Sequence, residues 1–337
     1  MAKDNGQRQW PKTGDTGVTM KLGMQVMTRG PMALPGGIMA VTREAEALGF
    51  DYAALNDHLI VPQDIGSKYP YTDTGAWPGQ VFGECMDVLT AMAFVAGCTE
   101  RLRMLSSVIV VPHRPALLTA KMVATADVLS GGRLILGIGV GWMEEEFAAL
   151  EVPAFAERGA VTDEYMAACI ELWTKDDPKF DGKYTKFSDI AFAPKPVQKP
   201  HPPIWIGGES KAALRRTVRY ADGWFPASNN PKNKLDTVAR LQGGIAELHQ
   251  ISTQMGRDPA SIDLAYVTLW PVNWEAQEGP DGGRRILTGS AADMAADLNA
   301  LGQLGVTHMT LTFQTLDLNE TLDRMRRFAA DVLPLVK

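Results

Sequence analysis

The chain has 337 residues, of which 45% are hydrophobic and 21% are charged, the balance of a globular protein with a large buried core rather than of a disordered chain. This length suits one β/α barrel with insertions and does not require two domains. The formal net charge of −6 repels polyanions, and no cluster of basic and aromatic residues compensates for it, so nucleic acid is not an expected partner.

The N-terminal segment 1–20 is polar and contains Gly, Pro and Asn. We expect a flexible arm, because this segment lacks the apolar stretch of a secretory signal. No apolar run approaches the roughly 20 residues that cross a bilayer, so no membrane partner is expected. The cysteines Cys85, Cys98 and Cys169 form no CxxC pair, which favours a reducing compartment, with the cytoplasm as the default location.

Short runs rich in Val, Ile and Leu alternate with longer segments of helical periodicity, which is typical of repeated β-α units. The sequence predicts eight such units. The predicted strands are Lys21–Met27, Tyr52–Leu55, Leu102–Val108, Leu134–Gly139, Ile204–Gly207, Gly223–Pro226, Ile262–Leu269 and Thr307–Phe313. The predicted helices are Gly37–Leu48, Cys85–Cys98, Pro115–Leu129, Glu144–Ala149, Gly159–Trp173, Lys211–Tyr220, Lys232–Met255, Ala291–Leu304 and Leu318–Val332.

Two of the predicted strands, Leu134–Gly139 and Ile204–Gly207, show no alternation of polar and apolar residues. Such strands are covered on both faces, in a closed barrel or in an open doubly wound sheet. Eight consecutive units with no break in composition favour the closed (β/α)8 TIM barrel, as one domain over residues 21–337.

Three connections, residues 60–83, 175–203 and 271–289, exceed the roughly 12–15 residues beyond which structureless loops are uncommon unless they are functional. The first and third follow strands, so in a barrel they rise over the carboxyl ends of the strands, where active sites are built. The second is Pro-rich and precedes a strand. It predicts a small hairpin insertion, either for packing or as a substrate lid.

The fourth predicted strand ends in Gly137, Gly139 and Gly141. Without bulky side chains there, a flat ring or a phosphate can approach the backbone closely. For the acidic residues Glu144–Glu146 that follow, we expect a structural role, because carboxylates in the first turn of a helix are favoured by its dipole.

The fifth predicted strand leads through Gly207 and Gly208 to a helix that begins at Ser210. The unpaired N–H groups of a helix start, reached through glycines, form an anion site. An ordinary N-cap role for Ser210 is the equal alternative.

The second predicted strand is followed by Asn56, Asp57 and His58, at the position where a barrel carries reacting side chains. His58 is a candidate general acid or base, because the pKa of histidine lies near neutral pH. A structural histidine, bonded to Asp57 or to a carbonyl, is the alternative. The other histidines are weaker candidates by position: His113, His201, His249 and His308.

No HExxH and no paired Cys/His set occurs in the sequence, so no metal site is predicted. The GxSxG elbow of hydrolases and the GxxxxGK[ST] phosphate loop are also absent. No predicted strand end offers a convincing lysine for a Schiff-base lyase.

From Lys21 to the C-terminus the sequence resembles the bacterial luciferase-like flavin and deazaflavin oxidoreductases. The residues that carry this resemblance are, in chain order, Ala45–Asp51, Asp57-His58, Leu118–Asp127, Ser130–Arg133, Gly137–Phe147, Glu157-Arg158, Gly207–Ser210 and Tyr220–Trp224. Within the family the pattern is most similar to the branches that use coenzyme F420, a 5-deazaflavin.

The resemblance implies a role for each matching residue. A non-proline cis peptide, expected at Ser107–Val108, would press against the back of the deazaflavin ring, with an ordinary trans pair as the alternative. His58 would lie beside the reactive face, oriented by Asp57. The residues that would hold the cofactor through backbone amides or line its ring and ribityl chain are Gly139, Gly141, Trp142, Gly207, Gly208, Glu209 and Ser210.

One departure concerns the substrate. F420-dependent sugar-phosphate dehydrogenases of this family have a glutamate where this chain has Trp142, which argues against a sugar phosphate and for a more apolar pocket. Trp77, Trp142, Trp270 and Trp274 all lie in predicted rim loops, where they would line such a pocket or pack the loops.

The resemblance therefore implies hydride transfer between F420 and a small, rather apolar organic substrate, with His58 as proton donor or acceptor. The first alternative is an FMN-dependent monooxygenase supplied by a separate reductase. The second is a non-catalytic flavin- or deazaflavin-binding protein on the same barrel. A homodimer is compatible with the resemblance, because barrels of this family are often dimers.

Overall fold

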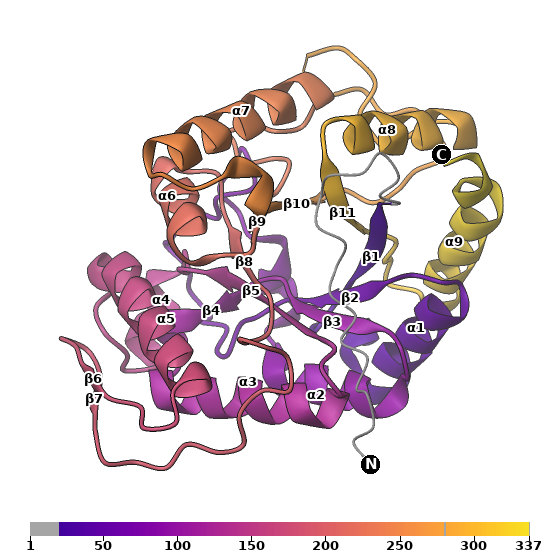
Figure 1. Cartoon of the computed structure of the whole chain (residues 1–337). Helices are drawn as coiled ribbons and strands as arrows, with labels where there is room; N and C mark the ends of the chain where they lie inside the picture. Colours follow the sequence, from indigo (N-terminus) through magenta and orange to yellow (C-terminus); the bar gives the residue numbers. More distant parts are fainter. Residues whose placement is uncertain (1–19, 280, 337) are drawn as a thin grey trace, which may run out of the picture.

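The computed structural model describes residues 20–279 and 281–336; residues 1–19 of the expected arm lie outside this range. In the described part of the chain, parallel strands form a closed barrel of eight staves (Figure 1). The staves are β1 (Lys21–Val26), β2 (Tyr52–Leu55), β3 (Arg103–Ser106) with its short continuation β4 (Ile109–Val110), β5 (Leu134–Gly139), β8 (Ile204–Gly207), β9 (Gly223–Phe225), β10 (Asp263–Val267) and β11 (Val306–Leu311). Pairing of β1 with β11 and of β3 with β5 closes the ring, which confirms the expected (β/α)8 fold.

Helices surround the barrel on the outside (Figure 1). They are α1 (Pro35–Ala47), α2 (Val88–Cys98), α3 (Ala116–Ser130), α4 (Glu144–Ala149), α5 (Arg158–Thr174), α6 (Lys211–Tyr220), α7 (Val238–Gln254), α8 (Ala291–Gln303) and α9 (Leu318–Asp331). Short 3-10 turns occur at Pro31–Ala33, Pro78–Phe82, Val111–His113, Phe155–Glu157, Pro259–Ser261 and Leu333–Leu335.

Apolar side chains fill both sides of the barrel wall. In β2, Ala53 and Leu55 join the large cluster between strands and helices, whereas Tyr52 and Ala54 belong to the cluster inside the barrel. The Tyr52 ring passes over Gly23 of the intervening strand β1, and its hydroxyl lies 2.8 Å from Thr310 Oγ1 of β11. Because both faces of the strands are buried, the sequence shows no polar alternation.

Three predicted elements differ from the structure by more than a shift of one or two residues at an end. The predicted third strand is interrupted after Ser106: the Ser107–Val108 peptide is cis, and the chain resumes as β4 at Ile109. Helix α2 begins only after Asp87, whose side chain accepts from the N–H of Thr90. Helix α7 begins at Val238 and not at Lys232, because Thr237 caps it by accepting from the N–H of Arg240.

The insertion 175–203 contains the predicted hairpin, formed by antiparallel β6 (Phe180–Asp181) and β7 (Lys186–Phe187) at the edge of the molecule (Figure 1). Phe187 and Phe192 join the outer core. Gln198 donates to Asp127 of α3, and the Lys195 ammonium donates to the carbonyl of Leu172 in α5. These contacts with the outer helices favour the packing role over the lid.

Candidate active site

His58 lies just beyond β2, and its ring is held by a buried carboxylate. His58 Nδ1 is 2.7 Å from Glu146 Oε2, while Glu146 Oε1 accepts from the N–H groups of Leu59 at 2.7 Å and Ile60 at 3.2 Å. Burial alone would raise the pKa of Glu146, but the bond from His58, the charges of both neighbouring histidines and the Leu59 N–H together hold it below its usual value. An ionised carboxylate only accepts, so Nδ1 carries a proton and Nε2 is the nitrogen that Glu146 does not engage.

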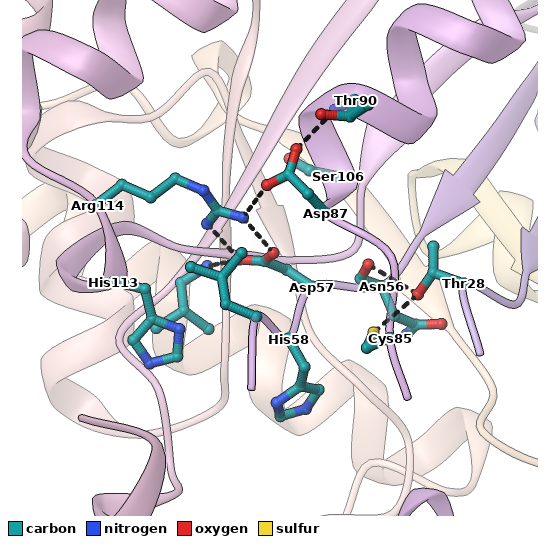
Figure 2. Close-up of polar contacts among 12 residues, drawn as sticks. Thr28, Asn56, Asp57, His58, Cys85, Asp87, Thr90, Ser106, His113 and Arg114 are labelled. Atoms are coloured by element: carbon teal, nitrogen blue, oxygen red, sulfur yellow. Dashed lines mark hydrogen bonds and ion pairs between the residues drawn. The ribbon is translucent and has the colours of Figure 1, made fainter. Parts of the chain in front are cut away.

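Asp57 does not orient His58, contrary to the expectation from the resemblance. Its carboxylate accepts from both terminal nitrogens of Arg114, at 2.9 and 2.8 Å, and from the N–H of Val110. Arg114 also pairs with Asp87, and Figure 2 shows Asp57 turned toward Arg114, away from the His58 imidazole. The physical reason is that a bidentate, charge-assisted pair occupies the carboxylate completely. Asp57 therefore holds β2, β4 and α2 together.

The acidic residues at the start of α4 do more than complement the helix dipole. Glu146 is fully buried, and Glu145 Oε1 accepts from the N–H groups of Gly66 and Ser67 at 2.8 and 3.0 Å. Both residues attach α4 to the connection after β2, a structural role that the helix dipole alone does not predict. Glu144 is exposed, as expected for a residue that only complements the helix dipole.

His113, a weaker candidate by position, also belongs to the site. It is buried, and its Nδ1 lies 3.7 Å from Glu146 Oε1. Burial lowers the pKa of His113, while the nearby carboxylate of Glu146 opposes this effect. Sequence reasoning missed the role of Glu146 and ranked His113 low, because only the closed barrel brings α4 and the turn after β4 to the end of β2.

Aromatic side chains surround His58. The ring centroid of Trp77 lies 4.5 Å from that of His58, and Trp142 lies 6.1 Å from His58 and 5.8 Å from Trp77. Tyr69 lies 5.1 Å from Trp142.

The other two expected rim tryptophans lie elsewhere. Trp270 donates to the carbonyl of Ile286 within the connection 271–289, and the ring of Trp274 packs under Arg327 of α9. The four tryptophans therefore do not form one pocket.

The expected non-proline cis bond at Ser107–Val108 is present. The Val108 side chain lies over two strand ends: a Cβ atom added at Gly139 would lie 2.5 Å from Val108 Cγ2, and one at Gly207 would lie 3.0 Å from Val108 Cγ1. Ser107 Oγ lies 3.5 Å from Gln25 Oε1 of β1. Val108 and the two glycines thus form an apolar surface that carries few side-chain atoms.

Gly141 has a packing reason to be glycine. Its φ is +86°, and an added Cβ would lie 2.7 Å from Phe147 and 2.9 Å from Val110. This close approach lets the chain turn directly into Trp142 and α4.

At the carboxyl end of β8, Gly208 adopts a φ of +102° and Ser210 caps α6, its Oγ accepting from the N–H of Ala213. The capping alternative for Ser210 is therefore confirmed. The Glu209 carboxylate accepts from the Ala227 N–H and from Asn230. Burial raises the pKa of Glu209 to about 6.

The predicted residues come together along one arc of the barrel rim. His58, Val108, Gly139 and Gly207 follow or end the consecutive staves β2, β3/β4, β5 and β8, whose carboxyl ends share one edge because all are parallel. Tyr71 of the connection 60–83 packs on the inner cluster beside Val108, and its carbonyl accepts from Asn229. This connection therefore covers the mouth of the barrel.

No helix in the described part of the chain is both long enough and apolar enough to cross a bilayer. Within residues 20–279 and 281–336, no group of three or more His, Cys, Asp or Glu side chains is arranged to hold a metal ion.

Comparison with known proteins identifies the family. Residues 20–278 match the model of the luciferase-like monooxygenase family. An uncharacterized protein of Mycobacterium tuberculosis is 33% identical over 188 residues, 55% of this chain and 66% of that protein. The FMNH(2)-dependent dimethylsulfone monooxygenase of Pseudomonas putida is 37% identical over 134 residues, 39% of this chain and 37% of that enzyme.

Among solved structures, the coenzyme F420-dependent tetrahydromethanopterin reductase from Methanopyrus kandleri superposes with a TM-score of 0.72 at 15% identity, covering 94% of this chain and 99% of that one. At this identity the likeness shows the fold alone.

Proposed function

We propose, on the premise that this chain belongs to the luciferase-like monooxygenase family, that it is an oxidoreductase that transfers a hydride between coenzyme F420 and a small organic substrate, with His58 as proton donor or acceptor. The observation that carries the proposal is the apolar surface of Val108, Gly139 and Gly207, next to His58 along the rim. A flat ring needs such a surface, poor in side chains, and a group that exchanges protons beside it.

The residues of the rim fit such a cofactor. Val108, Gly139 and Gly207 would lie behind the ring, with Gly141 and Trp142 at its edge. The backbone N–H groups at the start of α6, which follows Gly208 and Glu209, would face the phosphate in the tail of the cofactor. The Glu209 carboxylate accepts from Ala227 and Asn230, so Glu209 would contribute its backbone and not its side chain.

When bound, the cofactor supplies the hydride chemistry; the protein positions the substrate, excludes water and moves a proton. Glu146 holds the proton on His58 Nδ1, so Nε2 is the atom through which His58 exchanges a proton with the substrate. Trp77 and Trp142 cover the imidazole on two sides. They keep water from this exchange.

The second candidate is an FMN-dependent monooxygenase supplied with reduced flavin by a separate reductase. The observation that favours it is the 37% identity to the Pseudomonas putida enzyme, whose name states dependence on FMNH(2). A non-catalytic carrier of either cofactor would bind it without turnover of any substrate.

The cofactor assignment is tested by titrating the purified chain with F420 and, separately, with FMN, following quenching of cofactor fluorescence. We expect F420 to bind at least tenfold more tightly. Preference for FMN would overturn the assignment in favour of the monooxygenase.

The role of His58 is tested with His58→Asn in an assay of F420 reduction or reoxidation with a panel of small alcohols, ketones and hydroxy acids. We expect turnover to fall by about 10²–10⁴-fold, the usual contribution of a general acid or base, while F420 affinity changes little. His249→Asn, on the distant helix α7, is the control. Unimpaired turnover of His58→Asn would remove His58 from the mechanism.

A further inference from the structure

Arg29 follows β1 at the rim of the barrel, and among the described residues no hydrogen bond or ion pair to its guanidinium is found. The residue is half-buried, its Nε is buried without a hydrogen bond, and its guanidinium carbon lies 5.1 Å from the centroid of the Trp77 ring. A Cβ added at Gly79 would lie 2.8 Å from Arg29 Nε. The glycine thus leaves room for the arginine to lie against the indole.

The carboxylates of this region are all engaged by other groups. Asp57 and Asp87 pair with Arg114, Glu146 holds His58, and Glu209 binds Ala227 and Asn230. Within the described residues, Arg29 therefore has no anionic side chain to pair with. Burial lowers the pKa of Arg29, and only the Cys85 thiol and the Tyr69 phenol act against this effect.

A partly desolvated guanidinium beside no anion is unfavourable, because burying a charge costs free energy unless it is paired. Such a group is stabilised when a ligand brings the missing negative charge. Guanidinium is planar and binds carboxylate or sulfonate oxygens in a two-pronged arrangement.

The aromatic residues around His58 connect it to Arg29. The Trp77 ring contacts both residues: its centroid lies 5.1 Å from the Arg29 guanidinium carbon and 4.5 Å from the centroid of the His58 ring. The Trp142 ring lies beside the rings of His58 and Trp77. A small molecule anchored at Arg29 would thus lie beside these aromatic residues, on the side of the site that carries His58.

We propose that Arg29 binds an anionic group of the organic substrate, a carboxylate or a sulfonate, and that the substrate is a small organic acid with an apolar body. This inference rests on the proposed function and names its substrate class; it adds an anionic group to the expected small, rather apolar substrate. Arg29 follows β1, and α6 begins after β8. Because β2, β3 and β5 lie between β1 and β8 in the barrel, the group bound by Arg29 is distinct from the cofactor phosphate placed at α6.

The test measures binding by intrinsic tryptophan fluorescence, without cofactor and without turnover. The full chain is titrated with benzoate, benzenesulfonate and hexanoate, and with the neutral counterparts benzamide, benzenesulfonamide and hexanamide. We expect at least one acid to bind tenfold or more tightly than its neutral counterpart. Arg29→Gln should weaken that acid at least tenfold and leave the neutral compound unchanged, and Arg29→Lys should retain part of the preference.

Arg219→Gln is the matched control, because Arg219 lies 4.9 Å from the ring centroid of Tyr220 on the surface of α6. Since Arg29→Gln breaks no ion pair among the described residues, the variant should fold, which its thermal unfolding midpoint will show. Equal binding of all acids and their neutral counterparts, or unchanged acid binding by folded Arg29→Gln, would overturn the proposal.

Titration of the same variants with F420 and FMN distinguishes the two sources of an anion. Loss of cofactor affinity in Arg29→Gln with unchanged acid binding would assign the anion to the cofactor tail and overturn the substrate assignment. Failure of the wild-type chain to bind either cofactor would refute the proposed function, while the acid titration would still report on Arg29.

Discussion

At the scale of single residues, the pairing of His58 with Glu146 is the feature that the sequence pattern misassigned. Glutamates in the first turn of a helix have a sufficient explanation in the helix dipole, and nothing local separates Glu146 from Glu144. The distinction arises because α4 packs with one side toward the end of β2, which buries Glu146 and exposes Glu144.

Glu146→Gln tests the positioning role of this carboxylate. The amide NH₂ of the glutamine can only donate a hydrogen bond. Where it faces His58 Nδ1, that nitrogen must accept, so the imidazole carries its proton on Nε2. We expect turnover to fall at least tenfold, F420 affinity to change little, and the ¹⁵N shifts of His58 to report the changed tautomer. Glu145→Gln, which alters the neighbouring carboxylate, should leave the His58 signals unchanged. Wild-type ¹⁵N shifts in Glu146→Gln would contradict the assignment.

Glu209 predicts a pH dependence of stability. Burial raises its pKa from 4.5 in the unfolded chain to about 6 in the folded protein, so between these values the native state binds more protons. Its contribution to the free energy of unfolding therefore falls as pH rises through this window, by about 2 kcal/mol in total. In Glu209→Gln this contribution is absent.

The measurement is urea unfolding of wild type and Glu209→Gln near pH 4.5 and at neutral pH. Relative to the variant, the wild type should be more stable at the acidic pH than at the neutral one. The exposed Glu100→Gln serves as the control. A difference between wild type and Glu209→Gln that does not change with pH would contradict the prediction.

At the scale of elements, the interruption of the third strand determines the shape of the rim. The resemblance located the cis peptide correctly, but the sequence does not show that the Val108 side chain reaches the ends of both β5 and β8. Glycine at 139 is explained by this contact, since a side chain there would collide with Val108, while one at 207 would make a tight contact with it.

Gly139→Ala should therefore be destabilising by about 1–3 kcal/mol, the usual cost of an overpacked site, and should weaken F420 binding because Val108 is displaced. Gly243→Ala, in the middle of α7 where an added Cβ meets nothing within 4 Å, is the control and should stabilise the protein by about 0.4–1 kcal/mol. Thermal unfolding and F420 titration of the two variants measure both effects. Equal stability of the two variants would show that Val108 does not occupy this space.

At the scale of the whole molecule, the insertion 175–203 belongs to the same core as the barrel. Phe187 and Phe192 pack in the outer cluster with the helices, and Gln198 connects the insertion to α3 and to the carbonyl of Leu134 in β5. We therefore expect residues 21–337 to unfold as one domain.

Calorimetry tests this expectation. A single transition with equal calorimetric and van't Hoff enthalpies is expected, because no part of the barrel has a core of its own. Phe192→Ala should lower the midpoint of that single transition. Two resolved transitions, of which only one responds to Phe192→Ala, would show that the insertion is a separate unit.

The sequence by itself determined the number and order of the β-α units, the ends of several elements and the strand ends at which function is sought. These features follow from periodicity, caps and glycines, which act over a few neighbouring residues. Only the tertiary structure decided that Asp57 pairs with Arg114, that Glu146 binds His58, and that Arg29 packs on Trp77 with no anionic partner among the described residues. Such partners are chosen by distances between chain segments far apart in sequence, and these distances exist only once the barrel has closed.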